Sequence, residues 1–164
     1  MPQLNRDARH PVTLTLNGEE VSGFAEPRLL LSDFLTHEIG INSAHVGCEH
    51  GVCGACTVLI DAQPVRSCLM FAVQAVGREI RTVEGLAAAD GGLHPMQEAF
   101  WEKHGLQCGF CTPGFLMLAT GYLEANPGAS EADIREVLSS NLCRCTGYRN
   151  IVDAVMAAAV AMRP

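Results

Sequence analysis

The sequence predicts an α+β fold, with a small sheet in the first half of the chain and a group of helices in the second. Three observations lead to this prediction. Apolar and polar residues alternate early in the chain, helix start and stop signals dominate its later part, and a run of small residues separates the two. The predicted organisation has four parts, namely a tail at 1–10, a sheet domain at 11–86, a linker at 87–92 and a helical domain at 93–164.

The first half begins with an expected strand hairpin. Val12–Leu16 alternates apolar and polar side chains, the pattern of a half-buried strand, and Glu19–Phe24 is expected to return beside it. Asn17 and Gly18 tolerate the positive φ angles that the tightest hairpin turn requires. The other expected elements of this half are a helix at 29–38, with Pro27 at its first position and Gly40 as its stop, and strands at 57–60, 65–68 and 80–83.

The second half is expected to hold four helices, which together suggest a small bundle. The first runs over 93–104. The second begins with Thr112 as its cap and Pro113 as its first residue, and ends near Asn126. The third opens on a capping box of Ser130 and Asp133 and ends near 139, and the fourth, capped by Thr146, covers about 148–162.

Three cysteines in one short loop are the most specific feature of the sequence. Cys48, Cys53 and Cys56 have the spacing C-x4-C-x2-C, which is that of the [2Fe–2S] loop of plant-type ferredoxins. Cys68 is the expected fourth thiolate, because hairpin pairing would bring a strand at 65–68 back beside Cys56. Glycines at 47, 51 and 54 would let the backbone approach a cluster closely. Zinc is the alternative metal, but its sites usually consist of paired C-x2-C knuckles.

The other four cysteines form two pairs, each just before an expected helix start. Cys108 and Cys111 precede the helix at Thr112, and Cys143 and Cys145 precede the last helix. Free N–H groups at helix N-termini stabilise anions, so two such ends would suit an anionic cluster with four thiolates. A zinc site is a stronger alternative here than in the first loop, because all-thiolate zinc sites are common.

Composition limits the possible functions. The net charge of −7 argues against binding to nucleic acids or anionic membranes. The longest apolar run, Ala154–Met162, is too short to cross a bilayer, and residues 1–10 contain no apolar segment of a secretory signal. Eight cysteines at ligand spacings, without such a signal, indicate metal binding in a reducing, cytoplasmic location rather than disulfide bonds.

Three motifs together resemble a known family. They are GCEHGVCGACTV with Cys68, then GLQCGFCTPG, then NLCRCTGYRNIV, and the order and spacing of all eight cysteines match. The chain resembles the small iron–sulfur subunit of the molybdenum hydroxylases, the xanthine oxidase family, over about residues 11–162. The resemblance extends to bacterial enzymes with a separate small subunit, such as carbon monoxide dehydrogenase and the quinoline, isoquinoline and nicotine oxidoreductases.

The resemblance implies a β-grasp, plant-type ferredoxin-like domain followed by a four-helix bundle that binds a second cluster. It implies two [2Fe–2S] clusters and places Gln107 and Cys145 against a molybdopterin cofactor. The implied metal ligands are Cys48, Cys53, Cys56 and Cys68 for the distal cluster, and Cys108, Cys111, Cys143 and Cys145 for the proximal cluster.

The resemblance also implies partners and a role. A large subunit would hold molybdenum and molybdopterin, with cytosine dinucleotide as its expected form, and a medium subunit would hold FAD, in a dimer of heterotrimers. This chain would relay single electrons from molybdenum through both clusters to FAD and would have no catalytic residue of its own. The expected substrate is an N-heteroaromatic compound; the alternatives are carbon monoxide, an aldehyde or a purine.

Some alternatives and residue roles stay open at this point. A free two-cluster ferredoxin that shuttles between partners is the second functional hypothesis, and a structural zinc protein is the third. The roles of His50 and Arg144 are undecided, because thiolates already fill the first site and Arg144 lies between two ligands. His45, His94 and His104 are expected to be surface or helix-capping residues.

Overall fold

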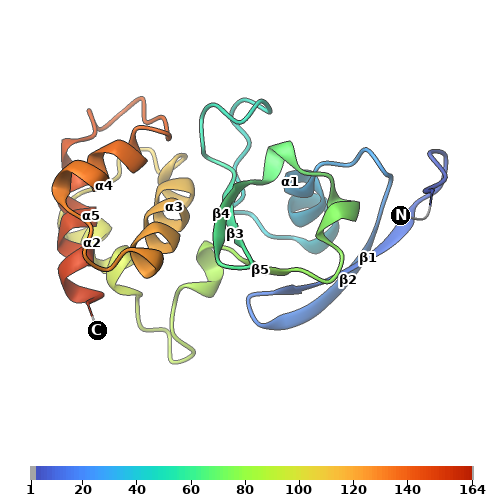
Figure 1. Cartoon of the computed structure of the whole chain (residues 1–164), viewed down its shortest axis with the longest axis horizontal. Helices are drawn as coiled ribbons and strands as arrows, with labels where there is room; N and C mark the ends of the chain where they lie inside the picture. Colours follow the sequence, from blue (N-terminus) through green and yellow to red (C-terminus); the bar gives the residue numbers. More distant parts are fainter. Residues whose placement is uncertain (1–2, 164) are drawn as a thin grey trace.

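The computed structural model describes residues 3–163 and has a sheet half beside a helical half (Figure 1). The strands are β1 (His10–Leu16), β2 (Glu19–Ala25), β3 (Thr57–Ile60), β4 (Gln63–Arg66) and β5 (Glu79–Arg81). The α-helices are α1 (Leu31–Asp33), α2 (Pro95–Glu102), α3 (Thr112–Ala125), α4 (Glu131–Leu138) and α5 (Arg149–Ala161). The α+β class predicted from the sequence is therefore confirmed.

The five strands form one mixed sheet in the order β2-β1-β5-β3-β4. Strands β1 and β2 pair antiparallel around Asn17 and Gly18, whose φ angles are 52° and 87°, so the predicted turn is confirmed. Strand β5 pairs parallel with β1 and antiparallel with β3, which joins the two hairpins into a single sheet.

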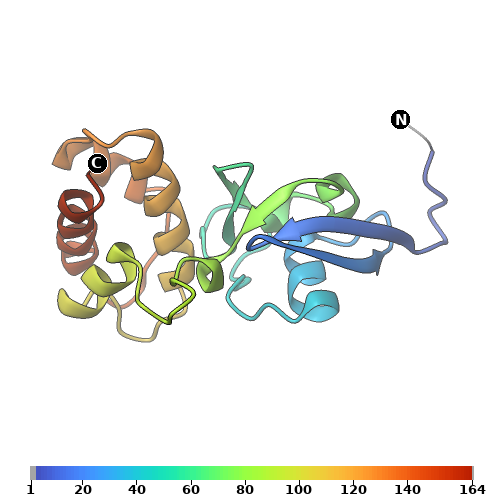
Figure 2. The same ribbon diagram turned by 90° about the horizontal axis from the view of Figure 1, so that it is seen from below.

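One helical segment covers a face of this sheet (Figure 2). It starts as α1 and continues without a break as a π-helical stretch over Phe34–Ile39, and Gly40 ends it with a φ angle of 90°. Leu31, Phe34 and Leu35 are fully buried in the sheet core, where β-strand residues such as Leu14 and Ile80 surround them.

The predicted start of this helix was wrong. The helix begins at Leu31 rather than Leu29, and Pro27 is not its first residue. Leu29 donates its N–H to Glu26 O at 3.0 Å, which closes a turn after Pro27. Leu30 then forms an isolated β-bridge with Phe71, and this tertiary contact holds it in extended conformation.

Cys68 also differs from its predicted setting. Strand β4 ends at Arg66, and Cys68 lies in a 3₁₀ turn over Ser67–Leu69 instead of on the strand. The backbone N–H and hydroxyl of Ser67 both donate to Cys56 O, at 3.3 and 2.8 Å. These two bonds keep Cys68 beside Cys56, as the sequence predicts, but they bend the chain out of the sheet.

Helices α2, α3, α4 and α5 share one core in the second half, which contains Phe100, Phe115, Met117, Ile134 and Ile151, each less than 2 % exposed. Ser130 and Asp133 form the predicted capping box of α4. The predicted caps of the other two helices are each misplaced: Cys111 occupies the position before α3, and Tyr148, with a φ angle of 69°, precedes α5.

The two halves of the chain are packed against each other. Leu59 of β3 belongs to the core of the helical half, and Gly121 of α3 faces Leu59 and Pro64. Arg81 of β5 forms an ion pair with Glu124 of α3 at 2.5 Å. Within residues 3–163, no helix has the length and apolar character that crossing a membrane would require.

Candidate iron–sulfur centres

The first set of four cysteines is assembled by one loop and one turn. Cys48, Cys53 and Cys56 lie in the loop between the helical segment and β3, and Cys68 reaches them from the turn after β4. Besides burial, Cys48 raises the pKa of Cys53, and Cys56 and Cys48 both raise the pKa of Cys68, so these thiols are close neighbours. The structure therefore brings these four thiols together as two pairs.

Glycine makes the tight wrapping of this loop possible. Gly51 and Gly54 have φ angles of 76° and 74°, which side-chain-bearing residues rarely adopt. A Cβ atom at Gly47 would lie 3.1 Å from Cys53 Sγ, so the missing side chain leaves room for the sulfur. Backbone and thiols can thus approach one another more closely here than ordinary residues would permit.

Backbone N–H groups favour negative charge at one end of this set. The N–H of Cys53 lies 3.4 Å from Cys48 Sγ, and it and the N–H of His50 lower the pKa of Cys48 to about 6. Burial has the opposite effect on Cys68 and raises its pKa to about 11, with the hydrogen bond to Cys56 adding to the rise. A metal that binds Cys68 must therefore displace its proton.

The second set of four cysteines lies at the start of α3 and in the connection before α5. Cys108 and Cys145 have sulfurs 3.4 Å apart, and besides burial Cys143 raises the pKa of Cys111, so these two thiols are also close neighbours. Cys143 also acts electrostatically on Cys108 and Cys145, so these two pairs adjoin as well. Helix α3 starts directly after Cys111.

In the second set, as in the first, the pKa is raised at some cysteines and lowered at others. Burial raises the pKa of Cys111 to about 12, and the hydrogen bond with Cys143 adds to the rise. Burial also acts against ionisation of Cys143, but hydrogen bonds from the Thr146 hydroxyl and from the N–H groups of Thr146 and Cys145 outweigh it and lower its pKa. At Cys108, the N–H of Phe110 is the largest influence and lowers the pKa.

Both sets suit a di-iron group better than a single ion. A [2Fe–2S] cluster takes four thiolates, two on each iron, and each set consists of two adjoining thiol pairs. N–H groups directed at sulfur atoms add the hydrogen bonds that such clusters accept.

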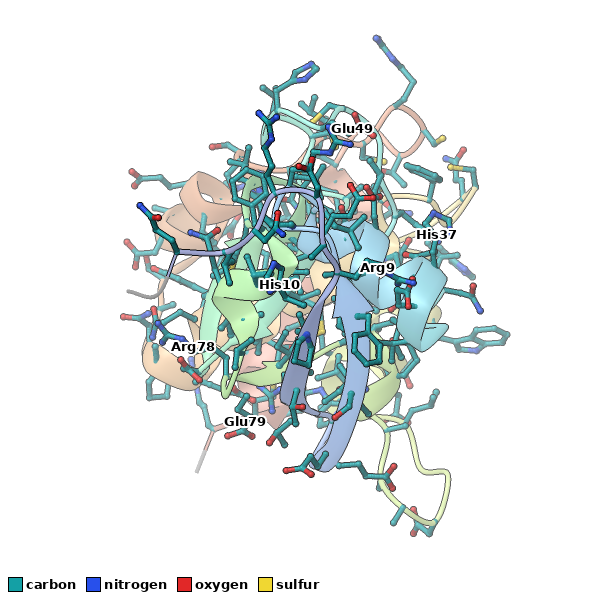
Figure 3. All side chains as sticks on the ribbon, turned by 90° about the vertical axis from the view of Figure 1, so that its right-hand side faces the viewer. Arg9, His10, His37, Glu49, Arg78 and Glu79 are labelled. Atoms are coloured by element: carbon teal, nitrogen blue, oxygen red, sulfur yellow. The ribbon has the colours of Figure 1, made fainter. Side chains whose placement is uncertain are left out.

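Other predicted site residues lie around these sets. Gln107 is exposed in the connection between α2 and α3, directly before Cys108. His50 and Arg144 are exposed, each beside one cysteine set. Figure 3 shows Glu49, the neighbour of Cys48 in the first loop, at the upper edge of the molecule, where sulfur atoms are visible.

Sequence reasoning missed three residues that contact or connect the cysteine loops. The hydroxyl of Tyr148 accepts the N–H of Cys143 at 3.0 Å, and Thr146 Oγ1 lies 3.1 Å from Cys143 Sγ. His45 joins the two loops, because its Nδ1 lies 2.7 Å from Phe110 O and its ring stacks on that of Phe110 at 4.8 Å. The positions of Tyr148 and Thr146, three to five residues after a ligand, were the available signal.

A sheet half and a helical half that each gather four free cysteines define a class: iron–sulfur proteins with two cluster sites. The model of the 2Fe-2S iron-sulfur cluster binding domain matches residues 14–87, and the model of the [2Fe-2S] binding domain matches residues 82–156.

Similar whole proteins agree with this class. The caffeine dehydrogenase subunit gamma of Pseudomonas sp. (strain CBB1) is 56% identical over 149 residues, which are 89% of each chain. The nicotine 6-hydroxylase small subunit of Paenarthrobacter nicotinovorans is 52% identical and covers 90% of this chain and 88% of its own. The crystal structure of quinoline 2-oxidoreductase from Pseudomonas putida 86 superposes with a TM-score of 0.89, at 48% identity, over 93% of this chain and 95% of that one. The chain belongs to the family of small [2Fe–2S] subunits of the molybdenum hydroxylases.

Proposed function

We propose that this chain is the electron-transfer subunit of a molybdenum hydroxylase, with two [2Fe–2S] clusters held by its eight cysteines. Cys48, Cys53, Cys56 and Cys68 would hold the distal cluster, and Cys108, Cys111, Cys143 and Cys145 the proximal cluster. The observation that supports this most directly is the arrangement of all eight thiols as four pairs in two sets.

Each cluster, when bound, supplies a site that accepts and releases one electron. The chain's own residues supply the thiolates, direct N–H groups at their sulfurs and keep the two sets in adjacent loops. Hydrogen bonds from N–H groups to sulfur stabilise the additional negative charge of a reduced cluster. This chain therefore relays electrons, and the chemistry on the substrate belongs to a partner subunit.

The partners follow from the relatives, whose names describe subunits of larger complexes. The chain would bind a large subunit with molybdenum and molybdopterin, as the cytosine dinucleotide, and a medium subunit with FAD, in a dimer of heterotrimers. Electrons would pass from molybdenum to the proximal cluster, then to the distal cluster and to FAD. Gln107 and Cys145 are exposed at the proximal set, which supports the proposal that they face the pterin.

The substrate of the complex is proposed to be an N-heteroaromatic compound. Relatives at 56% and 52% identity are named for caffeine and nicotine, and a structural neighbour at 48% is named for quinoline. The relative named for aldehydes is less similar, at 44%. Caffeine and xanthine are both purines, so the purine alternative falls within the same N-heteroaromatic class. The ring nitrogen shared by caffeine, nicotine and quinoline supports this substrate class.

The finer organisation is proposed in the same terms. Residues 11–86 would form a β-grasp domain and residues 93–164 a four-helix bundle, with a tail at 1–10 and a linker at 87–92. The separate apolar cores of the two halves support this division. A cytoplasmic location is proposed because all eight cysteines are free, and free thiols are typical of reducing compartments.

The test is spectroscopic. The native complex is purified without oxygen, its iron and acid-labile sulfide are measured per copy of this chain, and its electron paramagnetic resonance is recorded after dithionite reduction. We expect two irons and two sulfides for each of two clusters, and two distinguishable signals of reduced [2Fe–2S] type. One signal type alone, or a colourless protein that contains zinc, would contradict the proposal.

A further inference from the structure

A short segment joins the two cysteine sets, and we call it the 140–142 strap (Ser140, Asn141 and Leu142). It lies between the end of α4 and Cys143. Each of its three residues is hydrogen-bonded to the sheet half. Arg66 donates to Ser140 O at 3.0 Å and to Ser140 Oγ at 3.2 Å. Asn141 Nδ2 donates to Gly54 O at 3.4 Å. The Leu142 N–H donates to Cys53 O at 2.9 Å.

Asn141 is the buried centre of this strap. It is only 1 % exposed, and its Oδ1 has no hydrogen-bond partner within the described residues. An apolar side chain would avoid the cost of burying an amide oxygen without a partner. Asn141 offsets this cost with the hydrogen bond from its Nδ2 to Gly54 O. This bond connects the two cysteine sets, because Asn141 lies two positions before Cys143 and Gly54 lies between Cys53 and Cys56.

Gly54 is shaped to receive this side chain. A Cβ atom at Gly54 would overlap the amide group of Asn141, so only glycine leaves room for it. Gly54 O also accepts the N–H and the hydroxyl of Thr57, at 3.2 and 2.6 Å. On another side, Gly114 of α3 packs directly on the same carbonyl, where a Cβ atom would also overlap. The first cysteine loop is therefore fastened by contacts from the strap and from α3.

We propose that Asn141 is a positioning residue that fixes the separation of the two clusters by tying the 140–142 strap to the first cysteine loop. This inference rests on the proposed function, since it assumes that each cysteine set holds a cluster. Asn141 is buried within this chain and acts on cluster spacing through Gly54 and Cys143.

The experiment compares Asn141→Ala with Asn126→Ala in the purified complex. Asn126 is a matched control, because its Nδ2 also donates to a backbone carbonyl, Tyr122 O, at 2.9 Å, but it is exposed at the end of α3 and lies away from the cysteines. The first readout is the spin–spin interaction between the two reduced clusters, seen as splitting of their signals at low temperature. The second is hydrogen–deuterium exchange of the peptide that contains Leu142.

For Asn141→Ala we expect two clusters with unchanged iron content, a reduced or lost splitting, and exchange at Leu142 faster by about fivefold, the effect of one lost hydrogen bond. Asn126→Ala should match the wild-type protein in both readouts. Unchanged splitting together with unchanged exchange in Asn141→Ala would overturn the inference. Faster exchange at Leu142 with unchanged splitting would also overturn it, since the strap would then be loosened without any change in cluster spacing.

A second variant covers the case in which Asn141→Ala does not assemble. Arg66→Ala removes the bonds to Ser140 and one bond to Thr57 Oγ1, and it keeps Asn141. Arg78→Ala is its control, because Arg78 pairs with Asp61 in the sheet half and makes no bond to the strap. Arg66→Ala should weaken the splitting and Arg78→Ala should not; equal behaviour of the two overturns the inference. Should the wild-type complex itself give one signal type, the proposed function fails, and the exchange comparison at Leu142 still decides whether the strap holds the loops.

Discussion

At the scale of single residues, the packing of α3 against the first cysteine loop depends on a residue without a side chain, Gly114. Gly114 is buried in the first turn of α3, and a Cβ atom there would lie 2.9 Å from Ala55 Cα and closer still to Gly54 O. These neighbours are backbone atoms of the first cysteine loop, so they cannot move aside as a flexible side chain would. The close contact between α3 and this loop therefore requires glycine at position 114.

The first prediction concerns this contact. Gly114→Ala should destabilise the chain by roughly 1–3 kcal/mol, the usual cost of overpacking, and should push α3 away from Gly54. The measurement is thermal unfolding of the complex, followed through cluster absorbance. Gly128→Ala is the control, because nothing lies within 4 Å of a Cβ there and the φ angle is not in the left-handed range; it should be neutral or slightly stabilising. Equal losses in both variants would contradict the packing argument.

At the scale of elements, α2 depends on a histidine cap. His94 Nδ1 accepts the N–H of Met96 at 3.2 Å, and Gln97 Oε1 accepts the N–H of His94 at 2.9 Å, which together form a capping box. His94 can accept this bond only when Nδ1 is unprotonated. Burial lowers its pKa below the ordinary value of 6.5; the charge of Glu124 opposes this shift and that of Arg81 adds to it.

The second prediction is a pH dependence of this cap. Because the pKa of His94 is lower in the folded chain than in the unfolded chain, the unfolded chain binds more protons and stability rises with pH. The contribution should be complete above about pH 6.5 and should be lost as the pH falls towards the folded-state value, at a cost of up to about 1 kcal/mol. Hydrogen exchange of α2 between pH 5 and 8 measures it. His94→Asn keeps a capping side chain without a titrating group and should remove this dependence; if it does not, another group is responsible.

At the scale of the whole molecule, each half has its own core, and each half holds one cysteine set. The first set is held on the sheet side by β3 and the turn after β4, and the second on the helical side by the ends of α3 and α5. The Arg81–Glu124 ion pair, the His45–Phe110 contact and the 140–142 strap all cross between the halves. This arrangement suits a relay, because the two sites keep one relative position.

A structural feature could be predicted from the sequence where its contacts join residues that are close together in the chain. The turn at Asn17-Gly18 and the capping box at Ser130 depend on neighbours within a few residues, and both predictions were confirmed. The 3₁₀ turn at Cys68 depends on bonds from Ser67 to Cys56, and the late helix start at Leu31 depends on the bridge from Leu30 to Phe71, so neither could be predicted locally. The contact of Asn141 with Gly54 spans 87 positions and left no local pattern. Cysteine spacing, in contrast, indicated both sets directly.

The third prediction tests the order of the relay. Cys68→Ala should remove only the distal signal, because Cys68 belongs to the first set, and the substrate should still reduce the remaining cluster at the normal rate while steady-state turnover with an external acceptor is lost. Cys111→Ala should remove only the signal of the second set and should also abolish reduction of the other cluster by the substrate, since the electron would have to bypass the site that is proposed to lie nearest molybdenum. Rapid mixing with substrate, followed by cluster absorbance and freeze-quenched paramagnetic resonance, separates these cases. A Cys111→Ala complex whose distal cluster is still reduced quickly by substrate would reverse the proposed order, because electrons would then enter the chain at the first cysteine set.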